Sequence, residues 1–317
     1  MRAVFLDFGT VSNGDLDTAP LERLVPGLVL HQQTSTEQVA ERIAGFEVVF
    51  ANKAIIGRAA IAAAPQLKLI GLTATGVDNV DLVAARERGI AVCNLRDYCT
   101  QSVVQHVFAM LLALTHRLHD YSALVRAGGW QQAGQFSTFP YPIRELQGRV
   151  FGIVGYGTLG HAVARTAEAL GMRVEVANRP GGPQQDGRAD LDTLLPGLDV
   201  LSLHCPLTDA TRGLIGASRL ARMKPDAVLI NTARGALVNA AALATTLKNG
   251  RLGGAGIDVL EREPPPPGHP LLDPQIPNLI LTPHVAWAAR EARQRCLDEL
   301  ALNFVAFREG RQRNRVC

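Results

Sequence analysis

The chain has 317 residues, of which 47% are hydrophobic and 19% charged, and its net charge at pH 7 is +3. This length predicts about two domains with an ample core, and the composition is that of an ordinary globular protein. The basic residues are scattered, which argues against a nucleic-acid-binding surface, and the longest apolar stretch, within Val103–Leu114, is too short to span a membrane.

The five cysteines form no C-x-x-C pair and no metal-like spacing, so we expect no metal site. Thiols without such a pattern fit a reducing compartment. The first residues enter a strand directly, without a signal-peptide pattern. We therefore expect a cytoplasmic protein.

The first ninety-odd residues alternate between apolar runs of strand length and segments with helical spacing. The helical segments are Thr36–Ala44, which begins after a Ser/Thr cap, and Asp81–Arg88, which Gly89 ends. Such alternation predicts a parallel sheet with helices on both faces. The expected strands are Val4–Leu6, Leu28–Leu30, Val48–Ala51, Leu67–Leu72 and Ile90–Cys93.

One turn in this region, Thr73-Ala74-Thr75-Gly76-Val77-Asp78-Asn79-Val80-Asp81, directly follows a buried strand. Ligands gather at the carboxyl ends of such strands, so the turn is a candidate for contact with a substrate. The alternative is a plain loop in which Asp78 or Asn79 caps the next helix.

A long helix is expected from about Ser102 to Val125, in a position that suggests a connector between two α/β domains. The segment after it, 128–142, contains Gly128-Gly129-Trp130 and the aromatic, proline-containing stretch Phe136–Pro142, without a clear period. It is either an irregular surface loop or an arm that packs on another subunit. We favour the arm.

Residues 148–179 read as a strand, a glycine turn, a small-residue helix and a second strand. The turn, Gly155-Tyr156-Gly157-Thr158-Leu159-Gly160, has the G-x-G-x-x-G pattern of dinucleotide-binding βαβ units. Gly155 makes the tight turn, Gly157 admits a diphosphate, and Gly160 lets the helix and strand pack closely. The helix start favours the negative charge of the diphosphate. The alternative is an ordinary tight βα turn.

Beyond this unit the doubly wound pattern continues, and three strand ends carry polar groups: Arg234, Glu263 and His284. An arginine suits a planar carboxylate, and a histidine can exchange a proton near neutral pH, as carbonyl–alcohol interconversion requires. A carboxylate paired with that histidine would stabilise its protonated form. The expected strands are Asp199–His204, Ala227–Asn231, Ala255–Leu260 and Leu279–Thr282, followed by a helix over Val285–Arg308 and a basic, solvated tail to Arg315.

Each of these three residues also has a structural interpretation when taken alone. Arg234 could form a salt bridge at a helix start, Glu263 could be a solvated loop charge before Pro264-Pro265-Pro266-Pro267, and His284 could be a satisfied core histidine. Their common position at the edge that also carries the glycine turn favours a functional site.

Together these motifs resemble the D-isomer-specific 2-hydroxyacid dehydrogenases, and the His-x-Ala-Trp ending is most similar to the glycerate dehydrogenase/hydroxypyruvate reductase branch. The motifs are Gly155–Gly160, His204-Cys205-Pro206-Leu207-Thr208, Asn231-Thr232-Ala233-Arg234-Gly235, Asp258-Val259 with Glu263-Pro264, Thr282-Pro283-His284-Val285-Ala286-Trp287, and the turn Thr75–Asp81.

The resemblance implies a Rossmann cofactor domain, residues 99–286, inserted in a flavodoxin-like substrate domain, residues 1–98 plus 287–317. Both would be doubly wound parallel-sheet domains of an α/β protein. It further implies a homodimer formed mainly through the cofactor domain and an active site in the interdomain cleft.

The resemblance also assigns roles to individual residues. Arg234 would hold the substrate carboxylate and carbonyl, His284 would donate the proton during reduction, and Glu263 would pair with His284. Ala74, Thr75, Gly76, Val77 and Trp287 would complete the substrate contacts. The cofactor contacts would come from Gly155, Gly157, Thr158, Leu159, Gly160, Cys205, Pro206, Thr211, Thr232, Ala233 and Asp258.

Two departures from the family pattern stand out. The long helix has Val104-Gln105-His106 where the family commonly has Ala-Glu-His. At the end of the second strand of the βαβ unit, where an NAD enzyme has Asp or Glu for the ribose 2′-hydroxyl, this chain has Asn178-Arg179. A neutral Asn178 removes the repulsion toward a 2′-phosphate and Arg179 could pair with it, so we expect NADP(H) to be preferred, with NAD(H) possible. Alternatively, Arg179 points to solvent and selectivity is weak.

The sequence thus predicts an enzyme that reduces a small 2-oxoacid, of the glyoxylate or hydroxypyruvate type, to the D-2-hydroxyacid, and catalyses the reverse oxidation. Related dehydrogenases of the same fold that act on phosphoglycerate, formate or phosphite are the nearest alternatives. A nucleotide-sensing protein like the co-repressors that share this fold is an alternative from another class.

Overall fold

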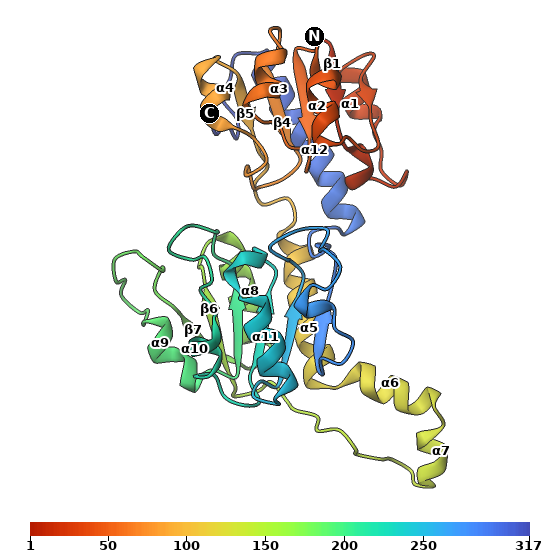
Figure 1. The fold of residues 1–317 in the computed structure, drawn as a ribbon, viewed down its shortest axis with the longest axis vertical. Coiled ribbons are helices and arrows are strands. Elements are labelled where there is room, and N and C mark those ends of the chain that lie inside the picture. The colour runs from red at the N-terminus through yellow and green to blue at the C-terminus, as the bar shows by residue number, and fades with distance from the viewer. The chain divides into compact units, whose positions relative to one another are not determined.

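The computed structural model describes residues 1–317 and divides into two compact units (Figure 1). We call them the terminal unit, Met1–Cys99 with Trp287–Cys317, and the central unit, Thr100–Ala286. No helix of either unit is both long and apolar enough to cross a membrane.

The terminal unit is built on a five-stranded parallel sheet with the strand order β2-β1-β3-β4-β5. This is the flavodoxin-like order, which confirms the expected fold of this part. The strands are β1 (Ala3–Phe5), β2 (Val29–Leu30), β3 (Val48–Ala51), β4 (Leu69–Leu72) and β5 (Ala91–Cys93). The helices are η1 (Phe8–Thr10), α1 (Ala19–Leu24), α2 (Thr36–Ile43), α3 (Arg58–Ala63), α4 (Leu82–Glu87) and α12 (Arg290–Arg308).

Helices cover both faces of this sheet because its side chains alternate between two apolar clusters. On one face, Leu300 and Phe304 of α12 pack against Phe50, whose ring meets that of Phe304 edge to face at 6.2 Å. On the other face, Ile43 of α2 and Ile61 of α3 belong to the second cluster. The C-terminal segment of the unit, Trp287–Cys317, is thereby fixed to a sheet formed by the N-terminal segment, Met1–Cys99.

The end of the chain differs from expectation. The basic segment after α12 is not a solvated tail, since Arg315 bridges antiparallel to Cys93 of β5. The N–H of Val316 donates to the carbonyl of Val92 (2.8 Å). Backbone pairing with an edge strand holds this segment, and such pairing depends on neighbours that are distant in sequence.

The central unit contains a six-stranded parallel sheet with the order β11-β10-β9-β8-β6-β7. The strand order reverses direction at β6, which has β7 on one side and β8 on the other, as in a Rossmann sheet. The strands are β6 (Val150–Val154), β7 (Arg173–Val176), β8 (Val200–Leu203), β9 (Val228–Asn231), β10 (Gly254–Ile257) and β11 (Leu279–Leu281).

Helices α5 and α8 pack together on one face of this sheet, where Phe108 stacks on Phe151 at 5.9 Å. Leu243 and Leu247 of α11 belong to the core cluster on the opposite face, with Leu229. The helices of the unit are α5 (Thr100–Thr115), α6 (Leu118–Arg126), α7 (Gly129–Ala133), α8 (Thr158–Ala169), α9 (Leu191–Leu194), η2 (Leu195–Gly197), α10 (Ala217–Leu220), η3 (Gly235–Leu237), α11 (Ala240–Lys248) and η4 (Pro270–Leu272).

Two expected helices have other boundaries. The helix expected over Ser102–Val125 is divided into α5 and α6 at Arg117, whose φ of +53° is left-handed and whose side chain pairs with Asp120 at 2.6 Å. The last helix begins at Arg290 rather than Val285, because the backbone is still non-helical at Ala289 (φ −54°, ψ 141°), and the N–H groups of Val285 and Ala286 bond to Asp258.

An arm formed by α6, α7 and the segment that returns to β6 extends away from the sheet of the central unit (Figure 1). Neither α6 nor α7 has a buried residue. Phe136 is 96% exposed and Phe139 is 80% exposed, and Trp130 is also exposed. The arm thus presents aromatic side chains that the central unit does not cover.

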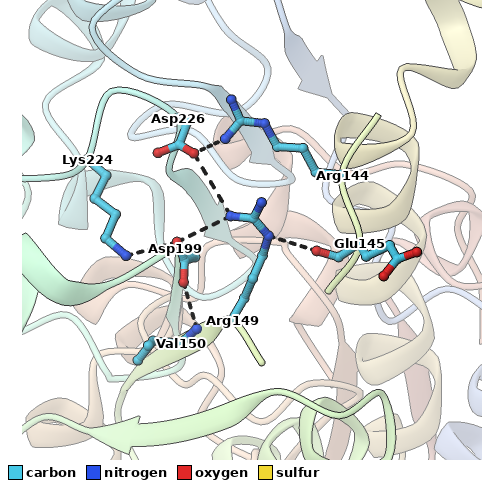
Figure 2. Close-up of polar contacts among 7 residues, drawn as sticks. All are labelled: Arg144, Glu145, Arg149, Val150, Asp199, Lys224 and Asp226. Carbon is cyan, nitrogen blue, oxygen red and sulfur yellow. Dashed lines mark hydrogen bonds and ion pairs between the residues drawn. The ribbon is translucent and has the colours of Figure 1, made fainter. Parts of the chain in front are cut away.

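The amino edge of the same sheet carries a cluster of three cationic and two anionic side chains (Figure 2). Asp199 accepts from the N–H of Val150 (2.8 Å) and pairs with Lys224 (2.9 Å) and Arg149 (3.3 Å). Arg144, which precedes β6, pairs with Asp226. The cluster ties the starts of β6, β8 and β9 to the segment that returns from the arm.

Candidate active site

The polar groups of interest in the central unit all follow strands of one parallel sheet, so they lie at its carboxyl edge. The glycine turn follows β6, Asn178 follows β7, and His204 follows β8. The remaining three, Arg234, Glu263 and His284, follow β9, β10 and β11, which are neighbours in the sheet. Parallel topology therefore brings together residues that are more than 100 positions apart in sequence.

The glycine turn is as tight as its pattern predicts. A Cβ on Gly160 would lie 2.1 Å from the Gly155 carbonyl oxygen, and one on Gly155, whose φ is +96°, would lie 2.5 Å from the backbone nitrogen of Cys205. A Cβ on Gly157 would meet nothing within 4 Å. Two glycines are required by packing, whereas the third leaves open space at the N-terminus of α8.

That open space fits a dinucleotide. Gly157 is the N-cap of the twelve-residue helix α8, and the exposed Thr158 and half-buried Leu159 begin its first turn. Helix N-termini offer backbone N–H groups to a diphosphate. Farther along the edge, the buried hydroxyl oxygen of Thr232 has no hydrogen-bond partner within the protein, and Ala233 beside it is half-buried. An open glycine cradle and an orphaned hydroxyl on one sheet edge are what a bound dinucleotide would complete.

The segment after β8 is held by its own polar groups. Burial lowers the pKa of His204 to about 4, so its ring is neutral at pH 7, and its Nε2 lies 2.8 Å from the Ser202 hydroxyl. Burial also raises the pKa of the Cys205 thiol to about 11, while Pro206 is exposed. The Thr211 hydroxyl donates to the Pro206 carbonyl (2.8 Å) and closes the turn.

Arg234 follows β9 in a turn stiffened by Asn231, whose side chain accepts from the Ala233 N–H (3.0 Å) and donates to the Arg234 carbonyl (2.9 Å). The guanidinium donates to the Ala233 carbonyl (2.8 Å). A Cβ on Gly235 would lie 1.9 Å from the carbonyl carbon of Leu260, so this turn packs directly on the loop after β10. That loop carries Glu263.

His284 and Glu263 form the pair expected from the sequence. Nδ1 of His284 lies 2.6 Å from one oxygen of the Glu263 carboxylate, and the other oxygen accepts from the N–H of Leu260 (2.8 Å). The His284 side chain is 25% exposed and that of Glu263 35%. The histidine is therefore neither a satisfied core residue nor a solvated loop residue. It is a partly accessible imidazole in contact with a carboxylate.

Asp258, which directly follows β10, fixes the backbone around His284. Its buried carboxylate accepts from the hydroxyl of Thr282 (2.6 Å) and from the N–H groups of Val285 and Ala286 (both 2.9 Å). His284 has a left-handed φ of +57°, which costs about 1–3 kcal/mol in a non-glycine residue and needs such support. Within the protein, then, the Asp258 carboxylate holds the histidine loop.

Sequence reasoning missed His106 and Thr282 as part of this arrangement. Nε2 of His106, on α5, lies 3.0 Å from the Thr282 hydroxyl and 3.6 Å from the Asp258 carboxylate. The sequence contained a signal for His106. In Val104-Gln105-His106, where the family commonly has Ala-Glu-His, only the histidine agrees with the family pattern. The structure holds no group of three or more His, Cys, Asp or Glu side chains that could bind a metal.

The remaining predicted substrate contacts lie in the terminal unit. The loop that contains Ala74–Val77 follows β4, and the side chain of Asn94 donates to the carbonyl of Thr75 (2.8 Å). Asn79 does not cap the next helix, because its side chain donates to the carbonyls of residues 52 and 54 and Asp81 is the cap. Ala74 is buried, Thr75 exposed, and Gly76 and Val77 half-buried. Trp287 meets Tyr98 edge to face at 6.3 Å.

Comparison with known proteins identifies the family. Residues 108–286 match the model of the D-isomer-specific 2-hydroxyacid dehydrogenase NAD-binding domain. The chain is 46% identical over 280 residues to a glycerate dehydrogenase of Methylorubrum extorquens (88% of each chain), and 35% identical over 316 residues to a hydroxypyruvate reductase of Blautia hydrogenotrophica (98% of each chain). The solved structure of an acyclic imino acid reductase, Bsp5, in complex with NADPH and D-Arg superposes over the full length of both chains with a TM-score of 0.87 at 27% identity.

These matches confirm the resemblance drawn from the motifs, including its glycerate dehydrogenase/hydroxypyruvate reductase branch. The chain belongs to the D-isomer-specific 2-hydroxyacid dehydrogenases and is an oxidoreductase that uses a nicotinamide cofactor.

Proposed function

We propose that the protein reduces glyoxylate and hydroxypyruvate to the 2-hydroxyacids, D-glycerate in the second case, with NADPH as reductant, and catalyses the reverse oxidation. The observation that carries this proposal is the 2.6 Å contact between His284 and Glu263, on the sheet edge that also holds the glycine turn. An imidazole stabilised in its protonated form is the proton donor that carbonyl reduction needs.

When bound, a reduced nicotinamide supplies the hydride for C2 of the oxoacid. His284 delivers a proton from Nε2 to the carbonyl oxygen, and Glu263, bonded to Nδ1, orients the ring and stabilises its charge. Arg234 binds the substrate carboxylate and polarises the carbonyl. The backbone N–H groups of Ala74–Val77 contribute to carboxylate binding, and Trp287 contributes to the substrate side.

The cofactor contacts follow the carboxyl edge of the central sheet. We assign the diphosphate to Gly157, Thr158 and Leu159, and the nicotinamide side to Thr232 and Ala233, because the orphaned Thr232 hydroxyl needs a partner. The adenosine side would be lined by Cys205, Pro206 and the turn that Thr211 closes. Asp258 would contribute indirectly, since its carboxylate is engaged by the histidine loop.

A small, polar substrate fits the slim loop after β4. Leu72-Thr73-Ala74-Thr75-Gly76 has no large side chain beyond its buried leucine, so it offers no broad apolar pocket. Glyoxylate and hydroxypyruvate meet this limit better than oxoacids with bulky apolar chains.

NADPH is the proposed reductant because the residues that directly follow β7, Ala177-Asn178-Arg179, include no acidic one, whereas NAD enzymes have one there for the ribose 2′-hydroxyl. Asn178 and the exposed Arg179 follow that strand. The ratio of kcat/KM for NADPH to that for NADH tests this choice. We expect a ratio well above one, and a clear preference for NADH would contradict it.

We also propose a homodimer in which the arm of one protomer is covered by its partner, because burying Phe136 and Phe139 would remove two aromatic side chains from water. Light scattering should give twice the 34.0 kDa mass of the chain. Phe136→Ser with Phe139→Ser should weaken the dimer. A wild-type monomer at micromolar concentration would contradict the proposal.

A cytoplasmic location is proposed from the five cysteines, all of which are free thiols in the structure. Fractionation of the native host, with blotting of the soluble and envelope fractions, tests it. Recovery outside the cytoplasmic fraction would count against it.

The decisive assay measures NADPH oxidation with a panel of 2-oxoacids, together with NADP⁺ or NAD⁺ reduction with 3-phosphoglycerate, formate and phosphite. We expect the highest kcat/KM with hydroxypyruvate or glyoxylate. Turnover restricted to one of the other three substrates would reassign the enzyme. Tight dinucleotide binding without any turnover would favour a nucleotide sensor instead.

A further inference from the structure

The loop after β7 is closed at its base. The N–H of Asn178 donates to the carbonyl of Ala189 (2.8 Å), and Ala177 bridges to Ala189 in parallel. Arg179 is the first residue beyond this base on the outgoing side, and Arg188 is the last before it on the returning side. The closure therefore brings two arginines, nine positions apart in sequence, to the same end of β7.

The side chain of Asn178 takes part in this closure. It is 8% exposed, and its oxygen accepts from the N–H of Gln185 (3.1 Å) while its nitrogen lies 3.5 Å from the carboxylate of Asp190. Asn178 thus shapes the loop, and any recognition of a charged ligand at this point falls to other residues.

Arg188 faces the glycine turn. Its guanidinium carbon lies 5.5 Å from the centre of the Tyr156 ring, a cation–π distance, and Tyr156 stands between Gly155 and Gly157. The ring of His161, on the first turn of α8, packs against the same tyrosine with centroids 3.7 Å apart. Arg188 is half-buried, so this contact fixes a cation between the turn and the end of β7.

Arg179 is supported from another direction. The aliphatic part of its side chain lies against Gly182, where an added Cβ would come within 3.2 Å of three of its carbons, and the N–H of Gly182 donates to the Arg179 carbonyl (2.9 Å). Two carboxylates of the same segment, those of Asp186 and Asp190, are also exposed, so the local charge is balanced rather than strongly positive. An anion would therefore bind to this segment through directed hydrogen bonds more than through its net charge.

We propose that Arg188 is a second determinant of cofactor specificity, which acts with Arg179 as a pair of guanidinium groups that bind the 2′-phosphate of NADPH. The ribose that bears this phosphate lies at the end of the second strand in Rossmann folds, which here is the end of β7. Guanidinium groups bind phosphate through paired, charge-assisted hydrogen bonds. This inference depends on the proposed preference for NADPH.

Equilibrium titration of the full-length enzyme with 2′,5′-ADP and with 5′-AMP tests the proposal without turnover. The wild type should bind 2′,5′-ADP at least about tenfold more tightly. In Arg188→Gln that ratio should fall about tenfold, the size of one charge-assisted hydrogen-bonded contact, while the affinity for 5′-AMP changes less than about twofold. Arg188→Lys should recover part of the ratio.

Arg173→Gln is the matched control, because Arg173 is an exposed arginine at the opposite end of the same strand. It should leave both affinities unchanged. If Arg188→Gln lowers the affinities for 2′,5′-ADP and 5′-AMP by the same factor and leaves the melting temperature unchanged, Arg188 only supports Tyr156. This result would overturn the proposal. If the wild type favours 2′,5′-ADP and Arg188→Gln has the same ratio of affinities, Arg188 does not bind the 2′-phosphate and the proposal is overturned, although the NADPH preference stands. A wild-type ratio near one would overturn the NADPH preference itself.

Discussion

The two edges of the central sheet use charged residues in different ways. At the amino edge, Asp199 and Asp226 are paired with Arg144, Arg149 and Lys224, and these contacts join strand starts to one another (Figure 2). At the carboxyl edge, the His284–Glu263 pair is partly accessible, and the backbone of His284 is held in a left-handed conformation. The same sheet thus carries a structural cluster at the starts of β6, β8 and β9 and the proposed catalytic pair after β10 and β11.

This difference follows from how each edge is built. The amino-edge carboxylate of Asp199 is 12% exposed and meets a backbone N–H as well as cations, so its contacts are satisfied within the fold. At the carboxyl edge, polar groups remain without partners within the protein. The Thr232 hydroxyl has no hydrogen-bond partner, and the space at Gly157 is open. Substitutions at the two edges should therefore separate stability from activity.

Apart from removal of the proton donor itself, the largest effect is expected from Arg234→Ala. Removal of the guanidinium takes away the proposed carboxylate partner, and kcat/KM for hydroxypyruvate should fall by about 10³-fold or more. Cofactor affinity, measured by fluorescence titration, should stay within about threefold of wild type. Full activity in this variant would refute the role of Arg234.

Glu263→Gln should lower kcat for reduction by about 10²-fold, because an amide cannot stabilise the protonated His284 ring as a carboxylate does. The melting temperature and the cofactor affinity, measured by fluorescence titration, separate this effect from simple loss of structure. Both should stay close to the wild-type values while kcat falls. Wild-type kcat in the variant would mean that Glu263 does not act on His284.

Asp199→Asn should lower the free energy of unfolding by about 2 kcal/mol, because the variant leaves three cations around one carboxylate. Although burial opposes it, hydrogen bonds from Val150 and Lys224 lower the pKa of Asp199 in the folded protein. Its stabilisation is therefore present above the unfolded-state pKa, near 4, and is lost as the pH falls through the lower folded-state value. Urea unfolding at pH 7 and pH 3 measures the loss of unfolding free energy in the variant and its dependence on pH. Equal stability of variant and wild type at pH 7 would contradict the structural role.

His204 is an exception to this division between a structural amino edge and a functional carboxyl edge, because it lies at the carboxyl edge and has a structural role. Its pKa of about 4 lies below the ordinary 6.5, so the unfolded chain binds more protons between these values and stability falls as the pH decreases. Between pH 7 and pH 5 this group should remove at most about 2 kcal/mol. His204→Gln should show a correspondingly smaller loss over the same interval, and identical pH dependence in both proteins would contradict a neutral His204.

The fold was accessible from the sequence because its signal is local and repeated. Apolar runs alternate with helical segments, and the glycine turn and the strand-end residues appear at the spacing of a known family. The capping box at Ser35 and Gln38 was likewise visible as a Ser/Thr cap. Fold class and family are confirmed, whereas the roles of the individual site residues stay predictions.

What the sequence did not predict depends on contacts between distant segments or on unusual backbone conformations. The break at Arg117 and the late start of α12 both involve non-glycine residues with positive φ, at 117 and 284, which propensity does not anticipate. Arg188 was missed because only the closure of its loop brings it to Tyr156. The support of His284 by Asp258 and Thr282 likewise appears only when β10 and β11 pair.

The most direct test compares the initial rate of NADPH oxidation with hydroxypyruvate for the wild type, His284→Ala and Asp199→Asn. Loss of the proton donor should lower kcat by about 10²-fold to 10⁴-fold in His284→Ala, while Asp199→Asn should retain wild-type kcat at a temperature where it is folded. Wild-type activity in His284→Ala, or an equal loss in both variants, would contradict the account that the carboxyl edge performs the chemistry and the amino edge maintains the fold.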